Sequence, residues 1–363
     1  MRVGLVATLV SGPASGAERR LLCLAPRLAA RGIEVVLFVS DRIERFPLPP
    51  GDRITFIPLG IPPRPALARA AAERLLLPRA VRRHRLDLLD IDHYPIPPIR
   101  DTPVVATLHD LRHLGGHPRA PLARRLLARR VYATSLARAA AVVAVSAFTA
   151  RQIEERLGVP RARLTVVPNA ADHLESPVRP VAAGDSLLHV GHVEPRKNLE
   201  VLIEALPRLD ARGIRLRIEL AGREGKRGTV RRLRSRAARL GVDDRIRFAG
   251  RVPDSDLPRL YGACFAAVFP SKYEGFGIPL LEAMRCGAPV VASNAAAHPE
   301  TGGDGALYFD PSDPGALASR VERLIREPAS REAAREAGRA RAAQFSWDRS
   351  AERLIEVYRT VAG

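Results

Sequence analysis

Short, almost uninterrupted apolar runs alternate along the chain with longer segments in which apolar residues recur every three or four positions. The short runs are typical of strands buried on both faces, and the longer segments are typical of amphipathic helices. Their alternation predicts parallel sheets with helices on both faces. In the first half of the chain the predicted strands are residues 3–10, 33–40, 54–59, 86–91, 104–108 and 141–145.

The same alternation starts again near Asp185. The predicted strands of the second half are residues 187–190, 216–221, 245–249, 264–269 and 289–293. Between the halves, residues 167–180 contain prolines and polar residues without periodicity, as in a linker. We therefore predict two domains, residues 1–175 and 176–344, followed by a C-terminal helix at residues 345–363.

Length and composition fit two packed cores. The chain has 363 residues, 46% of them hydrophobic, and single cores stop growing at about 250–300 residues. The longest charge-free apolar run, residues 139–150, has twelve residues and is too short to span a bilayer. Residues 1–10 mimic a short signal peptide, but we interpret them as the first strand of a βα unit.

Three cysteines, Cys23, Cys264 and Cys286, lie in apolar contexts without Cys-x-x-Cys spacing. We expect all three to be buried and reduced. This pattern excludes a metal site built from cysteines and favours a cytoplasmic protein.

The net charge of +19 raises the question of a nucleic-acid partner. The arginines are spread over almost every predicted helix. With 5% aromatic residues the chain offers no platform on which bases could stack, so no nucleic-acid partner is expected. The charge favours nucleotides, anionic sugars or a phospholipid surface. Residues 119–139 carry arginines among leucines and fit a helix on an anionic membrane or a plain surface helix equally well. These arginines are Arg124, Arg125, Arg129 and Arg130.

The most informative pattern is Tyr-Glu-Gly-Phe-Gly-Ile-Pro-Leu-Leu-Glu at residues 273–282. Gly275 and Gly277 allow a tight or positive-φ backbone just before a helix. Pro279 fits the first helical position, where its missing N–H is no loss. The pattern predicts a loop that leads directly into a helix.

Two glutamates eight positions apart, Glu274 and Glu282, flank this junction. A carboxylate accepts from both hydroxyls of a vicinal diol, so the pair suits two sugars at either end of a phosphate. The free N–H groups of the helix terminus would face that phosphate. A sugar nucleotide has this layout. In the alternative interpretation, Glu282 only complements the helix dipole and Glu274 is a solvated loop acid.

A second motif, Glu-Pro-Arg-Lys-Asn at residues 194–198, follows the predicted strand at residues 187–190. Asn198 is a good N-cap for the next helix. Arg196 and Lys197 are then held at a strand end beside a helix N-terminus, where a diphosphate gains from both cations and from backbone N–H groups. Taken alone, two adjacent cations on a surface loop are more often solvated, but their place beside a strand end and a helix N-terminus favours the diphosphate.

Together the two motifs resemble those of retaining glycosyltransferases of family four, which have the two-domain GT-B fold. The resemblance implies an α/β protein with two Rossmann-like, doubly wound parallel-sheet domains that face each other across a cleft, and a final helix that crosses back to the first domain. It also implies that Arg196 and Lys197 bind the donor's pyrophosphate, Glu274 the sugar hydroxyls and Glu282 the ribose diol. The other donor contacts implied for this segment are Gly275, Phe276, Gly277 and Ile278.

Two candidates follow the predicted strand at residues 104–108. A lone histidine is more often structural, but the strand's carboxyl end and the glycine-rich residues 114–116 favour a cleft at His109. In the family the corresponding histidine contacts the donor sugar near the reacting carbon, and the resemblance implies this role for His109. Asp110 is a candidate for the acceptor side.

Further candidates come from partial matches to the family. Gly16 fits close approach to phosphate or sugar, although residues 12–18 match the family's Gly-Gly-x-Glu-Arg loop only in part. Arg223 follows a strand and either reaches phosphate or is one more surface arginine. Arg251 and Val252 follow the next strand, where the family's backbone contacts the nucleotide base.

No metal or other cofactor is expected. Residues 90–92 and 254–256 have the Asp-x-Asp spacing of metal-dependent glycosyltransferases of another fold. The first, however, ends a strand of the first half, and the second predicts a turn that caps a helix. Two cations beside the leaving diphosphate would neutralise it without a metal.

The sequence therefore predicts transfer of a hexose, with mannose favoured, to a hydroxyl of a glycan or lipid-linked glycan with retained configuration. GDP-mannose is the favoured donor and a UDP-sugar the alternative. The expected location is the cytoplasm, including peripheral contact with the inner face of the plasma membrane. Two alternatives remain: another GT-B activity (a sugar-nucleotide epimerase or a phosphorylase) or a non-catalytic module that binds polyanions.

Overall fold

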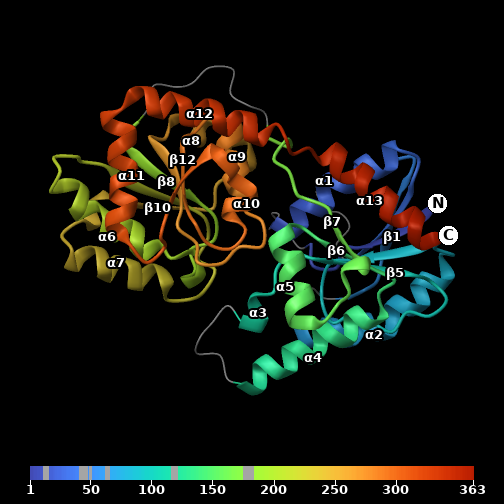
Figure 1. Ribbon diagram of the computed structural model, residues 1–363. Helices are drawn as coiled ribbons and strands as arrows, with labels where there is room; N and C mark the ends of the chain where they lie inside the picture. Colours follow the sequence, from blue (N-terminus) through green and yellow to red (C-terminus); the bar gives the residue numbers. More distant parts are fainter. Residues whose placement is uncertain (11–15, 41–47, 49–50, 62–65, 116–121, 175–183) are drawn as a thin grey trace. The chain divides into compact units, whose positions relative to one another are not determined.

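The computed structural model describes residues 1–10, 16–40, 48, 51–61, 66–115, 122–174 and 184–363. They form two compact units (Figure 1). Unit 1 contains Met1–Asn169 and Trp347–Gly363, and unit 2 contains Ala170–Ser346. Val167, just before the first boundary, belongs to unit 1, where Arg20 donates to its carbonyl at 3.0 Å. The boundary between Asn169 and Ala170 lies a few residues before the predicted domain boundary at 175. The boundary between Ser346 and Trp347 lies just after the predicted start of the last helix at 345.

Unit 1 is built on a seven-stranded, all-parallel sheet with the order β3-β2-β1-β4-β5-β6-β7. The strand order reverses between β1 and β4, which is where open parallel sheets bind ligands. The strands are β1 (Arg2–Val6), β2 (Glu34–Val39), β3 (Ile54–Pro58), β4 (Leu88–Ile91), β5 (Val104–Leu108), β6 (Ala141–Ala144) and β7 (Leu164–Val166). Runs such as Val-Val-Ala-Thr-Leu in β5 are buried throughout, as expected for a sheet covered on both faces.

Helices cover this sheet. They are α1 (Gly16–Ala30), α2 (Ala66–Arg83), α3 (Arg112–Gly115), α4 (Leu122–Arg138), α5 (Ala147–Leu157) and α13 (Trp347–Ala362). Although α1 and α13 stand at opposite ends of the sequence, they lie side by side (Figure 1). Arg31 of α1 pairs with Asp348 and Glu352 of α13 at 2.8 and 2.9 Å. The buried face of α13, with Trp347 and Tyr358 fully buried, completes the core of unit 1.

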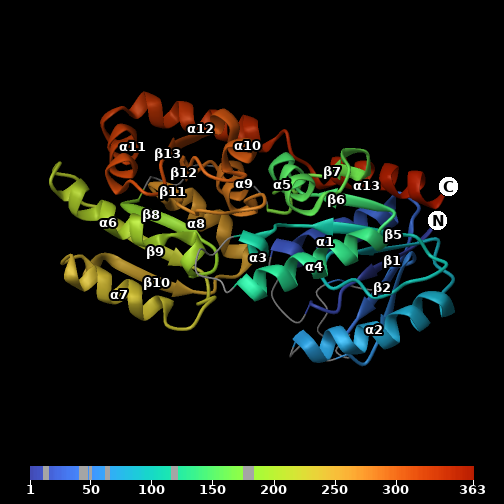
Figure 2. The ribbon, with the colours of Figure 1, turned by 60° about the horizontal axis from the view of Figure 1, so that its bottom comes forward.

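Unit 2 has a six-stranded, all-parallel sheet with the order β10-β9-β8-β11-β12-β13, which can be followed in Figure 2. The strands are β8 (Ser186–Val190), β9 (Arg217–Ala221), β10 (Ile246–Gly250), β11 (Ala266–Phe269), β12 (Val290–Ser293) and β13 (Ala306–Phe309). The helices are α6 (Leu199–Asp210), α7 (Thr229–Arg239), α8 (Leu257–Ala263), α9 (Ile278–Arg285), α10 (His298–Gly302), α11 (Pro314–Arg326) and α12 (Pro328–Ala342).

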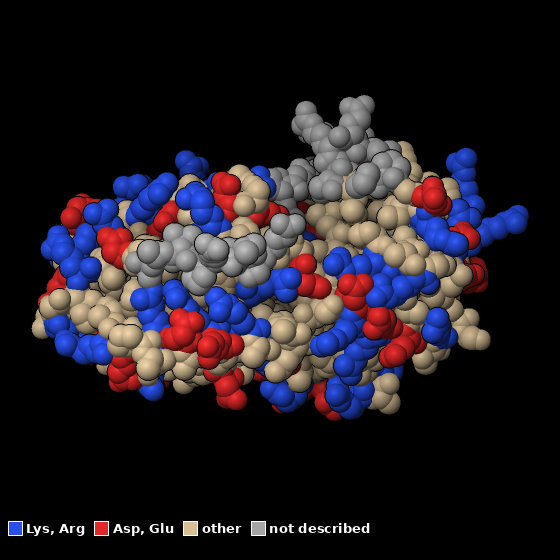
Figure 3. Space-filling view, turned by 90° about the horizontal axis from the view of Figure 1, so that it is seen from above, with Lys and Arg blue, Asp and Glu red and all other residues tan. Residues whose placement is uncertain are grey.

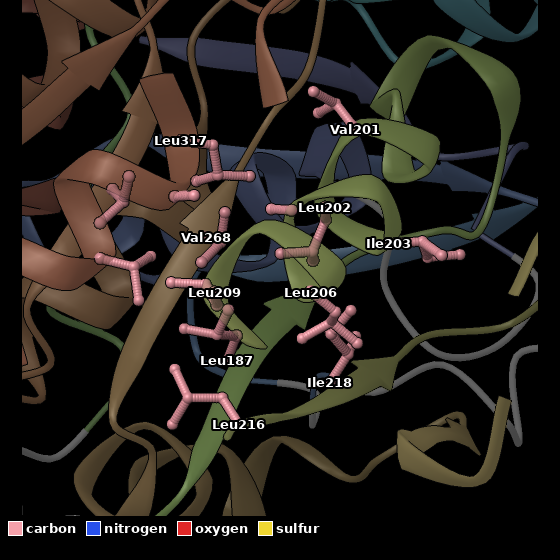
Figure 4. Close-up of a cluster of buried hydrophobic side chains, with 14 of the residues drawn as sticks. Leu187, Val201, Leu202, Ile203, Leu206, Leu209, Leu216, Ile218, Val268 and Leu317 are labelled. Atoms are coloured by element: carbon pink, nitrogen blue, oxygen red, sulfur yellow. The ribbon is translucent and has the colours of Figure 1, made fainter. Parts of the chain in front are cut away.

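One apolar cluster fills the space between the sheet of unit 2 and α6, α7 and α11. Figure 4 shows its central side chains, which come from α6, from α11 and from three neighbouring strands. Leu202, Leu206 and Leu209 of α6 are completely buried there. They recur at the three- and four-residue spacing from which the helix was predicted.

Each unit by itself is a Rossmann-like parallel-sheet domain, so the predicted fold class is confirmed. The predicted strand at residues 3–10 is shorter than expected, because the chain turns after Val6 and Val10 donates back to Ala7. Two edge strands were not predicted. β7 has only three residues, and β13 is only partly buried, so neither shows a long apolar run.

The three cysteines are free and buried, as predicted. Burial raises the pKa values of Cys264 and Cys286 to about 12, which makes them unreactive at neutral pH. Among the helices that the structure describes, none has both the length and the apolar character needed to cross a bilayer.

Candidate functional site

The two motifs of the second half of the chain meet at the carboxyl edge of the sheet of unit 2. Arg196 and Lys197 lie in a single 3₁₀ turn after β8, and Glu274 lies in the loop between β11 and α9. β8 and β11 are neighbours in the sheet. The order of the strands therefore joins two segments that are 77 residues apart in the sequence.

Glu274 holds both cations. Lys197 Nζ donates to Glu274 Oε1 at 2.6 Å, and Arg196 Nη1 lies 2.8 Å from Glu274 Oε2. Ser271 Oγ donates to Glu274 Oε1 at 2.9 Å, and Arg196 Nε lies 2.6 Å from Glu194 Oε1. The side chains of Lys197 and Glu274 are 9% and 13% exposed. The interpretation of these residues as solvated surface charges is therefore wrong.

Burial and charge have opposite effects on this cluster. Burial by itself would raise the pKa of Glu274, but the charges of Lys197 and Arg196 outweigh it and hold the pKa well below its usual range. Burial lowers the pKa of Lys197, and Glu274 opposes this effect. Glu274 is therefore a carboxylate at neutral pH, and the cluster holds two basic side chains between two acidic ones, Glu274 and Glu194.

Asn198 does not cap α6 as predicted. Its backbone is left-handed, with φ 55° and ψ 39°, and its side chain makes no cap hydrogen bond. The buried amide instead donates to the carbonyls of Pro270 and Pro311 at 3.2 and 2.7 Å. Asn198 thereby ties the turn that carries Arg196 and Lys197 to the ends of β11 and β13.

The loop before α9 has the geometry that its glycines predict. Gly277 has φ 102° and ψ 55° and stands at the N-cap of α9. A Cβ on Gly277 would lie 3.3 Å from His298 Cδ2. Pro279 is the second residue of the helix, not the first as predicted.

Two histidines that the sequence did not single out lie in unit 2 close to the predicted site. His298, at the start of α10, is bonded through Nδ1 to Ser293 Oγ at 2.9 Å. Burial lowers its pKa to about 4, so its ring is neutral at pH 7. His189 in β8 is completely buried. His189 lies near the end of β8, which is a weak signal, and no sequence pattern pointed to His298.

Glu282 is more deeply buried than its place one turn inside α9 suggested. It is 3% exposed, accepts from Tyr261 at 3.3 Å, and lies 3.0 Å from His173 Nε2. Glu282 therefore makes specific contacts with Tyr261 and His173 in addition to any effect on the helix dipole. Glu282 is held by Tyr261 of α8 and by His173, which lies shortly after residue 169 in the sequence. No local sequence pattern connects these residues.

Three weaker candidates lie after neighbouring strands of unit 2. Arg223, after β9, is exposed and donates to His192 at 2.9 Å. Arg251 and Val252 follow β10. Arg251 is exposed and Val252 half-buried. All three stand at the same edge of the sheet as Glu274, since all strands are parallel.

In unit 1, the neighbouring strands β4 and β5 bring two residues together at their carboxyl ends. His109 Nε2 lies 3.4 Å from Asp92 Oδ2. Asp110 Oδ1 accepts from the backbone N–H of Arg112 at 3.0 Å, so Asp110 caps the short helix α3. Gly115 is the last residue of α3, so the predicted glycine-rich loop at residues 114–116 is shorter than expected. Its last residue, 116, lies outside the described residues.

Gly16 is exposed and is the first residue of α1, so it starts the helix rather than lying inside a loop. Residues 12–15 of that predicted loop lie outside the described residues. Gly16 was predicted as the last residue of the loop, so α1 begins one residue earlier than expected.

The two Asp-x-Asp segments have different surroundings. In the first, Asp92 contacts His109, whereas Asp90 lies in β4 inside the core, where Tyr358 donates to it. Burial raises the pKa of Asp90 to about 6. Asp254–Asp256 is a 3₁₀ turn before α8, as predicted, but Asp256 makes no side-chain cap hydrogen bond.

Positive charge is spread over the surface. On the face shown in Figure 3, Lys and Arg occur on both units and are mixed with Asp and Glu. They do not gather in one stripe on that face. The exposed leucines of the described residues, in contrast, lie on two helices of unit 1, α2 and α4. They are Leu75, Leu76, Leu122, Leu126 and Leu127.

Comparison with known proteins identifies both halves of the chain. Residues 14–173 match the family model described as Glycosyltransferase Family 4, and residues 183–341 match the model described as Glycosyl transferases group 1. Over 174 residues the chain is 41% identical to O-antigen chain mannosyltransferase B of Escherichia coli, a match that covers 47% of this chain and 45% of the relative. The first curated relatives are all matched over less than half of their own length.

Two solved structures have the same fold over almost the whole chain. Sucrose-phosphate synthase from Thermosynechococcus elongatus superimposes with a TM-score of 0.83 at 20% identity, covering 99% of this chain and 98% of that one. HepE of Anabaena, in complex with UDP-glucose, superimposes with a TM-score of 0.76 at 21% identity, covering 99% and 100%. At these identities the two structures support the fold alone.

Proposed function

Because this chain belongs to the glycosyltransferases of group 1 and family four, we propose that it transfers a hexose from a nucleoside diphosphate sugar to an acceptor hydroxyl. The product would be a glycan or a lipid-linked glycan of a surface polysaccharide. The observation that carries the proposal is the cluster of Arg196, Lys197 and Glu274 at the carboxyl edge of the sheet of unit 2. Two cations held beside a helix N-terminus fit a diphosphate.

In the proposed reaction, Arg196 and Lys197 bind the donor's diphosphate and neutralise the charge that develops as it leaves. The bond between the anomeric carbon and the diphosphate oxygen breaks, and a bond to the acceptor oxygen forms on the same face. Because the new bond forms on the face that the leaving group vacates, the configuration is retained, and the leaving oxygen takes the acceptor's proton. Preorganised cations supply the charge stabilisation, and the proposed reaction requires no metal or other cofactor.

Other residues would position the donor. Glu274 would exchange part of its contact with the cations for sugar hydroxyls, and Glu282 would bind the ribose diol. The loop over Gly275, Phe276 and Gly277, with Ile278, would lie along the phosphates. In the same proposal, Arg223 adds a phosphate contact, and Arg251 and Val252 lie beside the base. Gly16 would approach the donor from unit 1.

We propose the remaining contacts for unit 1. His109 would contact the donor sugar near the reacting carbon, and Asp110 would face the acceptor. Both follow the carboxyl end of β5, the position where parallel sheets bind ligands.

The favoured donor is GDP-mannose. The match to an E. coli mannosyltransferase supports mannose, whereas the HepE complex with UDP-glucose supports a UDP-sugar as the alternative. On the face shown in Figure 3, basic and acidic side chains are mixed, and no basic stripe of the kind that binds nucleic acid is present there.

The proposed location is the cytoplasmic face of a membrane. Leu122, Leu126 and Leu127 of α4 are 67%, 56% and 64% exposed, and Arg125 and Arg129 beside them are exposed as well. Exposed leucines among arginines fit the headgroup boundary of an anionic bilayer. A helix of this kind would hold the enzyme near a lipid-linked acceptor.

The proposal is tested by thermal unfolding with GDP, UDP, ADP and their sugar conjugates in excess EDTA. A ligand at a hundred times its dissociation constant adds about 2.7 kcal/mol. At about 2–4 °C for each kcal/mol, this is a shift of roughly 5–11 °C for a domain of this size. We expect a shift with one base alone, and the same donor should give a glycosylated product with retained configuration in EDTA. Activity that appears only with added Mg²⁺ or Mn²⁺ would contradict metal independence.

Other outcomes identify the alternatives. Consumption of the donor without an acceptor product would indicate an epimerase, and release of a sugar phosphate that depends on phosphate would indicate a phosphorylase. No shift with any nucleotide, together with salt-sensitive binding to nucleic acid, would indicate a module that binds polyanions.

A further inference from the structure

A row of alternating acidic and basic side chains lies in unit 1 behind His109. Arg69 and Glu73 come from α2, Asp92 and His93 from the end of β4, and His109 from the end of β5. Arg69 Nε lies 3.4 Å from Glu73 Oε1, and His93 Nε2 lies 3.1 Å from the same oxygen. Asp92 then stands between two imidazoles, 3.5 Å from His93 Nδ1 and 3.4 Å from His109 Nε2.

The row is buried at one end and reaches solvent at the other. Glu73 is completely buried, where Thr8 also donates to it, and the side chain of His93 is 6% exposed. The side chain of His109 is 21% exposed, but its Nε2 is buried. The accessible part of the ring is therefore not the nitrogen that faces Asp92.

Charge keeps Asp92 ionised. Burial by itself would raise its pKa, but His109 and His93 outweigh this and hold the pKa well below its usual range. Burial would lower the pKa of His93, yet Asp92 and Glu73 raise it to about 9, so His93 is an imidazolium at pH 7. Asp92 is thus a fixed carboxylate with a cation on one side and the ring of His109 on the other.

We propose that Asp92, itself held by His93 and Glu73, is a positioning residue that fixes the ring orientation and the tautomer of His109. The inference rests on the proposed role of His109 in donor binding. A carboxylate accepts only, so Nε2 of His109, 3.4 Å from Asp92 Oδ2, can bond to Asp92 only when Nε2 carries the proton. In the neutral ring, Nδ1 would then keep its lone pair and present an acceptor, not a donor, to a hydroxyl of the donor sugar.

This arrangement has a consequence for the reaction. Fixing a single ring orientation removes the rotation and tautomer exchange of His109 before the sugar arrives. A positioning residue such as Asp92 affects turnover more than donor affinity. The Nδ1–H tautomer of His109 still fits the site but cannot accept the sugar's hydrogen bond.

The experiment is Asp92→Asn in the full chain, with ¹⁵N NMR of the histidine ring nitrogens at pH 7.5. The amide that replaces the carboxylate can donate to Nε2, so we expect a shift of His109 from the Nε2–H tautomer towards the Nδ1–H tautomer. We expect kcat to fall on the order of 10–100-fold, as for other residues that orient a functional histidine, with little change in KM for the donor. In a His109→Ala background, Asp92→Asn should cost almost nothing further.

Asp90→Asn is the matched control. Asp90 lies two residues earlier, is buried, and is bonded to Tyr358 and Thr107, not to His109. We expect it to leave the tautomer of His109 and the turnover unchanged.

Three results would overturn the inference. They are an Nδ1–H tautomer of His109 in the wild-type protein, an unchanged tautomer in Asp92→Asn, and an undiminished effect of Asp92→Asn in the His109→Ala background. The first needs no variant, so the inference can fail even where Asp92→Asn does not fold. Full activity of His109→Ala would instead contradict the proposed role of His109, and the tautomer measurement would still decide the role of Asp92.

Discussion

Lys197 tests the proposed chemistry at the scale of a single residue, because its buried ammonium is directed by Glu274 and by the turn after β8. Lys197→Ala removes a preorganised charge beside the leaving diphosphate. We expect it to lower kcat/KM by about 2–4 kcal/mol of transition-state stabilisation, as measured by steady-state kinetics with the donor identified by thermal unfolding.

Lys226→Ala is the matched control, since Lys226 is exposed on a loop at the same edge of the sheet. It should retain nearly wild-type kinetics. Near-normal turnover of Lys197→Ala would exclude a role for this ammonium in the reaction.

Asp90 predicts a pH dependence of stability. Its pKa is raised from 3.8 to about 6, so between these values the folded state binds more protons than the unfolded state. The unfolding free energy therefore falls as the pH rises through this window, by on the order of 3 kcal/mol for this group. Asp90→Asn should reduce the fall, as measured by urea unfolding at pH 4, 5, 6 and 7.

Tyr358→Phe should instead increase this fall in the unfolding free energy. The hydroxyl of Tyr358 donates to Asp90 and lowers its pKa, so its loss should raise that pKa further and extend the pH range of the fall. An equal slope for wild type and Asp90→Asn would show that Asp90 does not titrate in this range.

At the scale of elements, the loop–helix junction of α9 depends on one glycine. Gly277 has φ 102°, and a Cβ there would meet His298 at 3.3 Å. We expect Gly277→Ala to lower the unfolding free energy by roughly 1–3 kcal/mol. It should also abolish the thermal shift caused by the donor, because the loop that we propose lies beside the phosphates would move.

Gly213→Ala separates the two effects. Gly213 has φ 73°, with no atom within 4 Å of a Cβ added there, and it follows α6. This variant should lose stability through backbone strain alone and keep the donor's thermal shift. Loss of the shift in both variants would mean that the junction of α9 has no special part in donor binding.

The elements also show how far local patterns predict a fold. Long buried strands such as β5 were placed correctly, because their apolar runs continue throughout. β13 was missed because an edge strand buries only part of its surface. Asn198 was expected to cap α6, but the carbonyls of Pro270 and Pro311, which no local pattern brings near, bind its amide instead.

At the scale of the whole molecule, the net charge of +19 and the exposed leucines of α4 predict binding to anionic membranes. Replacement of Leu122, Leu126 and Leu127 by Gln should abolish co-sedimentation with vesicles that contain phosphatidylserine or phosphatidylglycerol. Apolar contact is lost, although the arginines remain. Catalysis with a soluble acceptor should be unchanged.

Leu75→Gln on α2 is the control, since Leu75 is 62% exposed but lies outside α4. It should bind vesicles like the wild type. Equal binding of the wild type to zwitterionic and anionic vesicles, or unchanged binding of the α4 variant, would contradict the membrane proposal.

The sequence by itself determined the alternation of strands and helices, the two-domain class and the two motifs around Lys197 and Glu274, because each depends on neighbours within a few residues. Only the tertiary structure decided which of these meet. The order of the strands places Lys197 against Glu274 and Asp92 against His109. Strand order follows from how whole elements pack, and no pattern of nearby residues contains that information.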